Sequence, residues 1–251
     1  MSFFSKIFSV ANKEPDLRLL KDYSSVIADI HSHFIPGIDD GAATLEDSIH
    51  LLKSMHNLGF RKFVTTPHMM SDMYRNTNEI ILKGLETLRL AMAAENIPVT
   101  IHAAAEYYID SGFLERIEQK NLLTITGNTV LVELSYINLP EKLTDVFFEM
   151  RLNGYAILLA HPERYPFWYS NFNEYTDLKN QGILFQININ SLSGYHGIPA
   201  MKIAERLIDE NMVDYIGSDM HNIKHLQALL DALKSKHLAR LVRRGVMNQL
   251  L

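Results

Sequence analysis

The sequence predicts an α/β domain built on a parallel sheet, and three observations lead to this prediction. From about residue 25 onward, short runs rich in β-branched residues alternate with amphipathic stretches of helical periodicity. No Gly/Ser-rich or Pro-rich linker divides the chain, so the alternation belongs to one domain. A length of 251 residues, 47% of them hydrophobic, is sufficient for the core of one barrel-sized domain.

Seven short runs are the strand candidates. In chain order they cover residues 26–33, 62–66, 99–106, 130–134, 156–160, 183–188 and 215–218. Seven βα units in an undivided domain favour a barrel-like parallel sheet, although an open doubly wound sheet has the same sequence rhythm. Periodicity therefore leaves both architectures open.

Six amphipathic stretches between the strand candidates predict helices. They cover residues 44–58, 77–94, 141–152, 173–180, 199–210 and 223–234. The first begins with Thr44 and Asp47, which have the spacing of a capping box. Ile49, Leu52 and Met55 then form an apolar stripe on one helical face.

Residues 1–24 precede this alternation, and we predict that they form a tail, with a short amphipathic helix as one form it could take. Lys6 interrupts any signal-peptide core. The longest strongly apolar run, at residues 156–160, is much shorter than the about 20 residues that cross a bilayer. We therefore expect no transmembrane segment, a cytoplasmic location, and a single domain over residues 25–251.

Composition excludes several classes of protein. Lys and Arg number 24 against 29 Asp and Glu, so the formal charge of −5 leaves no cationic surplus for nucleic acid. The chain has no cysteine, which excludes disulfides, thiolate metal sites and thiolate nucleophiles. Histidine numbers 11, about twice average usage. Any metal site must therefore be built from His, Asp and Glu.

The motif DIHSHFIPGIDDG places two histidines on one face of the first strand. Because side chains alternate along a strand, His31 and His33 point to the same place. H-x-H is a short pattern, so two packed histidines remain an alternative to a metal site. Asp29 would either orient an imidazole or accept a backbone hydrogen bond. Asp39 and Asp40 follow on a glycine-bounded loop that either reaches the same place or forms a simple turn.

Five further strands also end in residues that bind metals. The ligand candidates are His68 after VTTP, Glu106 in AAAEY, Glu133 in LVELS, His161 in LLAHPER, and Asp219 with His221 in IGSDMH. Charges at a core boundary cost free energy unless they are paired or bound to metal. In βα barrels the carboxyl ends of the strands form the active-site rim. The sequence therefore predicts a metal centre there.

This set exceeds the four ligands of one tetrahedral zinc, which predicts two or three divalent ions. The mixture of nitrogen and oxygen donors suits Mn, Zn or Fe. The remaining histidines fall mostly on predicted helices or loops, where we expect core or surface positions. They are His50, His56, His102, His196, His225 and His237.

Arg164, three residues after His161, is our candidate for a phosphate clamp. A guanidinium offers two parallel donors to phosphate oxygens. The alternative is a salt bridge with Glu163 or with a loop carboxylate.

The motifs together resemble the PHP superfamily of metallohydrolases, and within it the bacterial tyrosine phosphatases of the CpsB/CapC-like family, encoded with capsule and exopolysaccharide genes. The resemblance covers about residues 25–235, through DIHSH, PGIDDG, TPH, AAEY, VELS, AHPER, NINS and GSDMHN. It implies a distorted, TIM-like (β/α)7 barrel with up to three ions, Mn first and Fe or Zn as alternatives. The ligands that it implies are His31, His33, Asp40, His68, Glu106, Glu133, His161, Asp219 and His221.

The departures from the family pattern leave every ligand in place. Ser32 stands where relatives often carry Cys, and Met69 stands where some carry a further His. Relatives also place a basic residue a few positions after the final histidine, and Lys224 is its nearest counterpart here. We expect Lys224 to bind substrate phosphate together with Arg164.

The resemblance implies hydrolysis of phosphotyrosine on a partner protein, typically a tyrosine autokinase of polysaccharide export. Bound metals lower the pKa of water toward about 7, so hydroxide attacks phosphorus without a covalent intermediate. The implied catalytic residues are Asp40, Arg164 and His221. Aromatic residues near the strand ends would form a wall against the tyrosine ring, although each fits the core or surface as well: Tyr107, Tyr136, Tyr165 and Trp168.

Three alternatives remain open. A PHP-type phosphoesterase acting on a small phosphomonoester, such as histidinol phosphate, would use the same metals, but the mostly short loops favour a protein substrate. An amidohydrolase would bridge its metals with a carboxylated lysine where this chain has Glu133. A catalytically silent scaffold protein would have lost some of the metal ligands, and the complete set in this sequence argues against it. The residues predict no oligomeric state.

Overall fold

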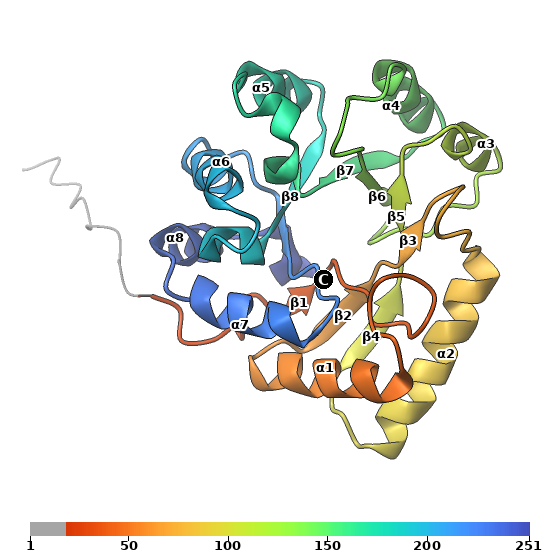
Figure 1. Ribbon diagram of the computed structural model, residues 1–251, viewed down its shortest axis with the longest axis vertical. Coiled ribbons are helices and arrows are strands. Elements are labelled where there is room, and N and C mark those ends of the chain that lie inside the picture. Colours follow the sequence, from red (N-terminus) through yellow and green to blue (C-terminus); the bar gives the residue numbers. More distant parts are fainter. Residues whose placement is uncertain (1–18) are drawn as a thin grey trace, which may run out of the picture.

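Parallel strands surround the centre of the fold, and helices cover their outer side (Figure 1). The computed structural model describes residues 19–251, so most of the predicted tail lies outside the described residues. The strands of this part are β1 (Ala28–Asp29), β2 (Lys62–Thr65), β3 (His68–Met69), β4 (Thr100–Ala103), β5 (Glu106–Tyr108), β6 (Thr129–Glu133), β7 (Ala156–Ala160), β8 (Leu184–Asn188) and β9 (Tyr215–Gly217). Every pair of hydrogen-bonded strands is parallel, in the orders β1-β2-β4 and β3-β5-β6-β7-β8-β9.

Two of the seven predicted strands are broken, which is why there are two sheets. The second is interrupted between β2 and β3 at Pro67, whose missing N–H cannot join a ladder. The third is interrupted between β4 and β5. Hydrogen bonds continue across both breaks, from the Ala104 amide to the Thr65 carbonyl and from the Glu106 amide to the Pro67 carbonyl. The broken strands thus stay neighbours, and the sheet curls.

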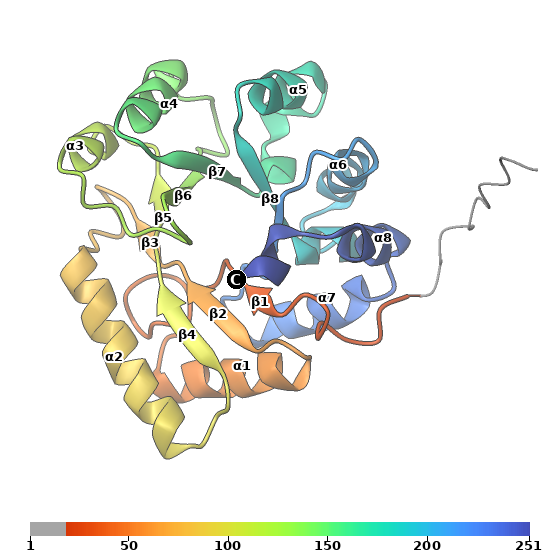
Figure 2. The same cartoon turned by 180° about the vertical axis from the view of Figure 1, so that it is seen from behind.

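The first and last strands approach each other without forming a ladder. A single bridge joins Ser32 to Met220. Lower in the gap, the buried amide of Asn248 donates to the carbonyls of Ala28 and Ile216, at 2.9 and 2.7 Å, and accepts from the Ile216 amide at 3.0 Å. Asn248 belongs to the short helix η4 (Met247–Leu250), and Figure 2 shows this end of the chain beside β1. A side chain therefore satisfies backbone groups that the missing ladder leaves open.

The helices of the described residues confirm the six predicted ones within two residues at each end. They are α1 (Leu45–Asn57), α2 (Asn78–Ala94), α3 (Phe113–Glu118), α4 (Leu143–Leu152), α5 (Asn173–Asn180), α6 (Ile198–Asp209), α7 (Ile223–Ala232) and α8 (Lys236–Arg244). Thr44 and Asp47 form the predicted capping box of α1. The sequence patterns did not predict α3 and α8.

The strands separate two clusters of apolar side chains. In β6, Leu131 joins a small inner cluster, whereas Val130 and Val132 join the large cluster that packs against the helices. Because side chains alternate, Glu133 lies on the inner side, two residues beyond Leu131. Within residues 19–251, every helix is too short or too polar to span a bilayer.

We expect Asn248→Ala to lower the free energy of unfolding by about 2–4 kcal/mol, because it removes three hydrogen bonds and leaves buried backbone groups unpaired. Urea unfolding measures the change. The exposed Asn171, whose side-chain amide donates to the Glu174 side chain, provides the control Asn171→Ala. Equal stabilities for the two variants would show that Asn248 does not hold β1 and β9 together.

Candidate metal centre

The predicted ligands gather on the inner side of the fold, at the carboxyl ends of the strands. Four overlapping groups each bring ligand atoms within 4.8 Å of one another. The groups are His33, Asp40, His68 and His221; His31, Glu106 and His161; His31, His33 and Asp219; and His68, Glu106 and Glu133. All nine predicted ligands belong to at least one group.

The deepest part of the centre consists of two imidazoles that share two carboxylates. His31 Nε2 lies 3.2 Å from Glu106 Oε2 and 3.4 Å from Asp219 Oδ1. His33 Nε2 lies 3.5 Å from each of the same two oxygens. Both histidines are completely buried.

Glu106 and Glu133 stand side by side against two further histidines. Glu106 lies 3.2 Å from His68 Nδ1 and 3.0 Å from His161 Nε2, and Glu133 lies 3.7 and 3.6 Å from the same nitrogens. Burial and the charge of Glu106 raise the pKa of Glu133 well above its usual value. Burial also opposes ionisation of Glu106, but His31 and His68 hold its pKa well below the usual value. Ligand atoms of these two buried carboxyl groups lie within 4.8 Å of each other, so a cation between them would stabilise both in the ionised form.

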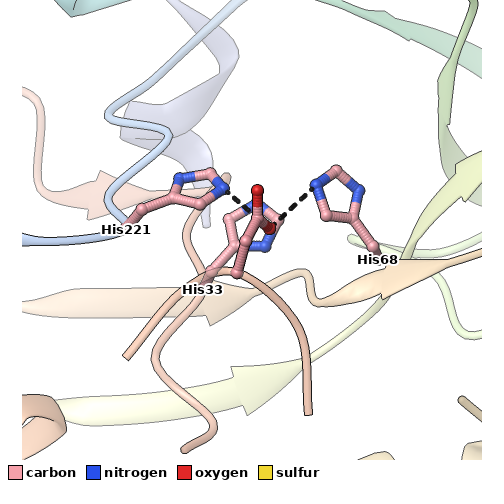
Figure 3. Close-up of side chains that lie close together, drawn as sticks. His33, His68 and His221 are labelled. Atoms are coloured by element: carbon pink, nitrogen blue, oxygen red, sulfur yellow. Dashed lines mark ion pairs between the residues drawn. The ribbon is translucent and has the colours of Figure 1, made fainter. Parts of the chain in front are cut away.

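Asp40 forms the outer edge of the centre. Its Oδ1 lies 3.5 Å from His68 Nε2 and 3.4 Å from His221 Nε2, and dashed lines mark both pairs in Figure 3. The side chain of Asp40 is 53% exposed, whereas that of His221 is 14% exposed. Asp40 therefore faces the solvent side, where a substrate would arrive.

These residues fit a cluster of divalent ions. Four buried ligand atoms lack a hydrogen-bond partner: His31 Nε2, His33 Nε2, His68 Nδ1 and Glu106 Oε2. An unpaired buried polar atom costs about 1–3 kcal/mol, which a bound cation would offset. Burial opposes protonation of His31, yet Glu106 and Asp219 raise its pKa to about 9. Protons therefore compete with a cation for the same atoms.

Asp39 orients the centre from outside. Its Oδ2 accepts a hydrogen bond from His33 Nδ1 at 2.7 Å and another from the His68 amide at 3.1 Å, while its Oδ1 accepts from the Gly41 amide at 2.9 Å. Because Nδ1 carries the proton, the Nε2 lone pair of His33 points to the centre. The geometry thus separates the two aspartates of the loop: Asp40 faces the centre, and Asp39 holds a ligand.

A chain of amides does the same for His31. His31 Nδ1 donates to Gln186 Oε1 at 2.7 Å, Gln186 Nε2 donates to Asn188 Oδ1 at 2.9 Å, and Asn188 Nδ2 donates to Asp219 Oδ2 at 2.7 Å. We did not single out Gln186 from the sequence. Two amide residues at alternate positions of the buried strand β8 are the signal that would have identified it.

Asp29 contacts no imidazole in this way. Its carboxylate accepts from the backbone amide and the hydroxyl of Ser218, both at 2.7 Å. We predicted two alternative roles for Asp29, and the one observed is the hydrogen bond to backbone, which joins the first strand to the last.

Two candidate ligands stand on left-handed backbone. His161 has φ 32° and Asp219 has φ 51°, values that cost free energy for residues other than glycine. His161 follows β7 and Asp219 follows β9, at the points where the chain leaves the direction of the strand. The surrounding contacts hold both residues in this strained conformation, which aims their side chains at the centre.

A cavity of about 320 Å³ opens above the centre. Arg164, in the short helix η1 (Pro162–Arg164), lines it and donates from Nη1 to Asp219 Oδ2 at 2.9 Å. The guanidinium also lies over the Tyr136 ring, 4.9 Å from its centroid. The predicted alternative partner Glu163 turns away, accepting from the Asn188 amide and the Ser191 hydroxyl. Arg164 thus pairs with a carboxylate of the centre itself.

Two of the other histidines, which we expected at core or surface positions, lie beside the centre. His196 and His225 both line the cavity. His225 Nδ1 lies 2.8 Å from the Asp219 carbonyl, one helical turn after His221, a spacing that could have indicated this position. His196 Nδ1 lies 3.0 Å from Ser191 Oγ. Tyr195 and Asn222 line the cavity as well, and we had singled out neither.

Three of the four aromatic residues near the strand ends are core residues, which is the alternative that the sequence left open for each of them. Tyr107 is buried, and its hydroxyl accepts from the Leu123 amide. Tyr165 is buried between the Leu134 amide and the Ala160 carbonyl, and Trp168 packs edge-on against it. Tyr136 alone of the four lines the cavity. Lys224 is exposed on the first turn of α7 and is absent from the cavity lining, so its contact with phosphate stays a prediction.

Comparison with known proteins places this chain among close relatives. The family model "Capsular polysaccharide synthesis, CpsB/CapC" matches residues 27–250. Tyrosine-protein phosphatase YwqE of Bacillus subtilis is 28% identical over 213 residues, which are 83% of this chain and 84% of the relative. Putative tyrosine-protein phosphatase CapC of Staphylococcus aureus is 29% identical over 208 residues, 82% of each chain.

A solved structure is also similar. It comes from crystal structures of YwqE from Bacillus subtilis and CpsB from Streptococcus pneumoniae, described as unique metal-dependent tyrosine phosphatases. The match has a TM-score of 0.75 at 28% identity and covers 82% of this chain and 86% of the other.

We expect Asp39→Asn to weaken manganese binding by about 10- to 100-fold, because an amide no longer fixes the ring orientation of His33. Titration calorimetry on the metal-free protein measures the affinity. Asp72→Asn, at an exposed aspartate, is the control. An unchanged affinity in Asp39→Asn would contradict the orienting role of Asp39.

Burial raises the pKa of Glu163 from 4.5 to about 7. The unfolded chain ionises this carboxyl at lower pH than the folded chain does. Its contribution to stability is thus complete below about pH 4.5 and is lost as pH rises through 7. As the pH rises from 5 to 8, the free energy of unfolding of Glu163→Gln should therefore increase relative to that of the original protein, by on the order of 3 kcal/mol.

Thermal melts in EDTA at pH 5 and at pH 8 test this expectation. Glu118→Gln, at an exposed glutamate, is the control and should show a constant difference from the original protein. A constant difference for Glu163→Gln as well would mean that Glu163 ionises normally.

Proposed function

This chain belongs to the CpsB/CapC family of capsular polysaccharide synthesis proteins, and from this premise we propose that it is a metal-dependent phosphatase acting on phosphotyrosine in a partner protein. One observation carries the proposal: four overlapping His/carboxylate groups and Arg164 border one cavity. Divalent ions held by these groups, together with the Arg164 guanidinium, would place positive charge where a phosphate dianion binds. The chain has no cysteine, so a thiolate phosphatase mechanism is excluded.

Two or three divalent ions are the proposed cofactors, manganese first and iron or zinc as alternatives. The proposed ligands are His31, His33, Asp40, His68, Glu106, Glu133, His161, Asp219 and His221. When bound, the ions supply the positive charge that lowers the pKa of water and neutralises the phosphoryl oxygens. Nine ligands in four groups support more than one ion, since a single ion takes about four to six.

The residues at the cavity prepare the substrate for attack. Arg164 is oriented by its bond to Asp219 and by the Tyr136 ring, so its remaining N–H groups can clamp phosphate oxygens. A hydrogen bond from His221 lowers the pKa of Asp40, partly offset by burial, so the carboxylate is ionised at neutral pH. The carboxylate oxygen of Asp40 that does not bind metal can then accept a proton from the attacking water, while His221 holds Oδ1 in position. No covalent enzyme intermediate forms.

The finer parts of the proposal concern the partner and the architecture. We propose a bacterial tyrosine autokinase as the substrate and the cytoplasm as the compartment. The nine parallel strands of residues 19–251 correspond to seven predicted strands, two of which are broken, and helices cover their outer side. This arrangement supports a distorted (β/α)7 barrel of the PHP type, in one domain over residues 25–251. Lys224 remains a proposed phosphate ligand that would have to reach over from α7.

We expect the manganese-loaded protein to hydrolyse a phosphotyrosine peptide in preference to a phosphoserine peptide and to histidinol phosphate. EDTA should abolish the activity, and added manganese should restore it. His161→Ala and Asp219→Asn should lower kcat/KM by at least about 100-fold, because each loses a ligand of the centre. Phosphate release measured with each substrate gives these values.

His56→Ala, at a histidine outside the centre, serves as the control and should retain full activity. Activity confined to histidinol phosphate would keep the metal centre but assign a small-molecule substrate. No activity with any metal would contradict a phosphatase.

A further inference from the structure

Two tyrosines lie near Asp219, each at the end of a separate chain of contacts. Tyr136, from the loop after β6, lies under the Arg164 guanidinium, which pairs with Asp219. In the second chain of contacts, His225 contacts the Asp219 carbonyl, and the Tyr195 ring lies 5.0 Å from the His225 ring. Both tyrosines line the cavity. The Tyr136 ring is already in contact with Arg164 and with the His161 ring, whose centroid is 5.8 Å away, whereas the Tyr195 ring is the more exposed of the two.

The Tyr195 ring is held in place although it is 45% exposed. It makes edge-to-face contacts with His225 and with His196, at centroid distances of 5.0 and 5.1 Å. Its backbone stands between Gly194 and Gly197, whose φ values of 83° and 91° form a turn that few other residues would adopt. This turn lifts the ring to the cavity mouth.

The depth of the centre matters for the choice of substrate. His31 and His33 are completely buried, and Glu106 is 1% exposed. A phosphate that approaches these residues must stand well out from the backbone of its own protein. In phosphotyrosine an aromatic ring separates the phosphate from the main chain, whereas in phosphoserine a single carbon does.

From this arrangement we infer that Tyr195 forms the aromatic wall of a slot at the cavity mouth, and that this slot selects aryl over alkyl phosphates by holding the substrate ring. Tyr195 is the specificity-determining residue that is new here. The inference rests on the proposed phosphatase function and deepens it. Contacts between aromatic rings are typically worth about 2- to 13-fold in affinity.

The test replaces Tyr195 and compares two substrates. Tyr195→Ala should lower the ratio of kcat/KM for a phosphotyrosine peptide over that for the matched phosphoserine peptide by about 2- to 13-fold, mainly through KM. Tyr195→Phe should restore the ratio. Ile198→Ala, at a residue 54% exposed and outside the cavity lining, is the control for the same turn.

A binding measurement keeps this inference separate from the proposed function. A peptide carrying the non-hydrolysable phosphonomethyl analogue of phosphotyrosine should bind Tyr195→Ala more weakly than the original protein by a similar factor. Equal loss with both substrates, or an unchanged ratio and an unchanged Kd, would overturn the slot. A protein that hydrolyses neither peptide would overturn the phosphatase function, while the Kd values would still decide whether the slot exists.

Discussion

Burial of the Glu106 carboxylate is the constraint on which the rest of the centre depends. It is 1% exposed, and its two oxygens lie within 3.5 Å of four imidazoles. A buried carboxylate is unstable without compensating charge. Three strand ends must therefore deliver four histidines to one point, with His31 and His33 both following β1, and the surrounding amides and Asp39 must hold those rings in a single orientation.

The irregularities of the sheet serve this convergence. The breaks in the second and third strands make His68 and Glu106 the first residues of β3 and β5, where they pair in register. On the opposite side, β1 and β9 do not form a ladder, and the side chains of Asn248 and Asp29 fill the gap between them. Regular hydrogen bonding is thus given up at three places near the centre, and side chains or offset backbone bonds replace it.

Much of the fold and of the ligand set could be predicted because both depend on local patterns. Apolar runs that end in His, Asp or Glu locate the rim, and caps such as Thr44 locate helix ends. The charged sequence of α8 obscured its apolar stripe of Leu238, Leu241 and Val242. Tyr195 could not be found in this way, because only the turn between two glycines brings it to the cavity. Tyr165 lies four residues from His161 and yet is a core residue, because its side chain points into the protein interior and not into the cavity. Closeness in sequence to a ligand therefore does not predict a place in the site.

The central claim is that these strand ends hold a cluster of divalent ions, and anomalous diffraction from crystals of the manganese-loaded protein tests it most directly. We expect two or three peaks of anomalous density within the four ligand groups, and two or three manganese ions per chain by elemental analysis of the same sample. Less than one ion per chain, or peaks only at surface carboxylates, would contradict it.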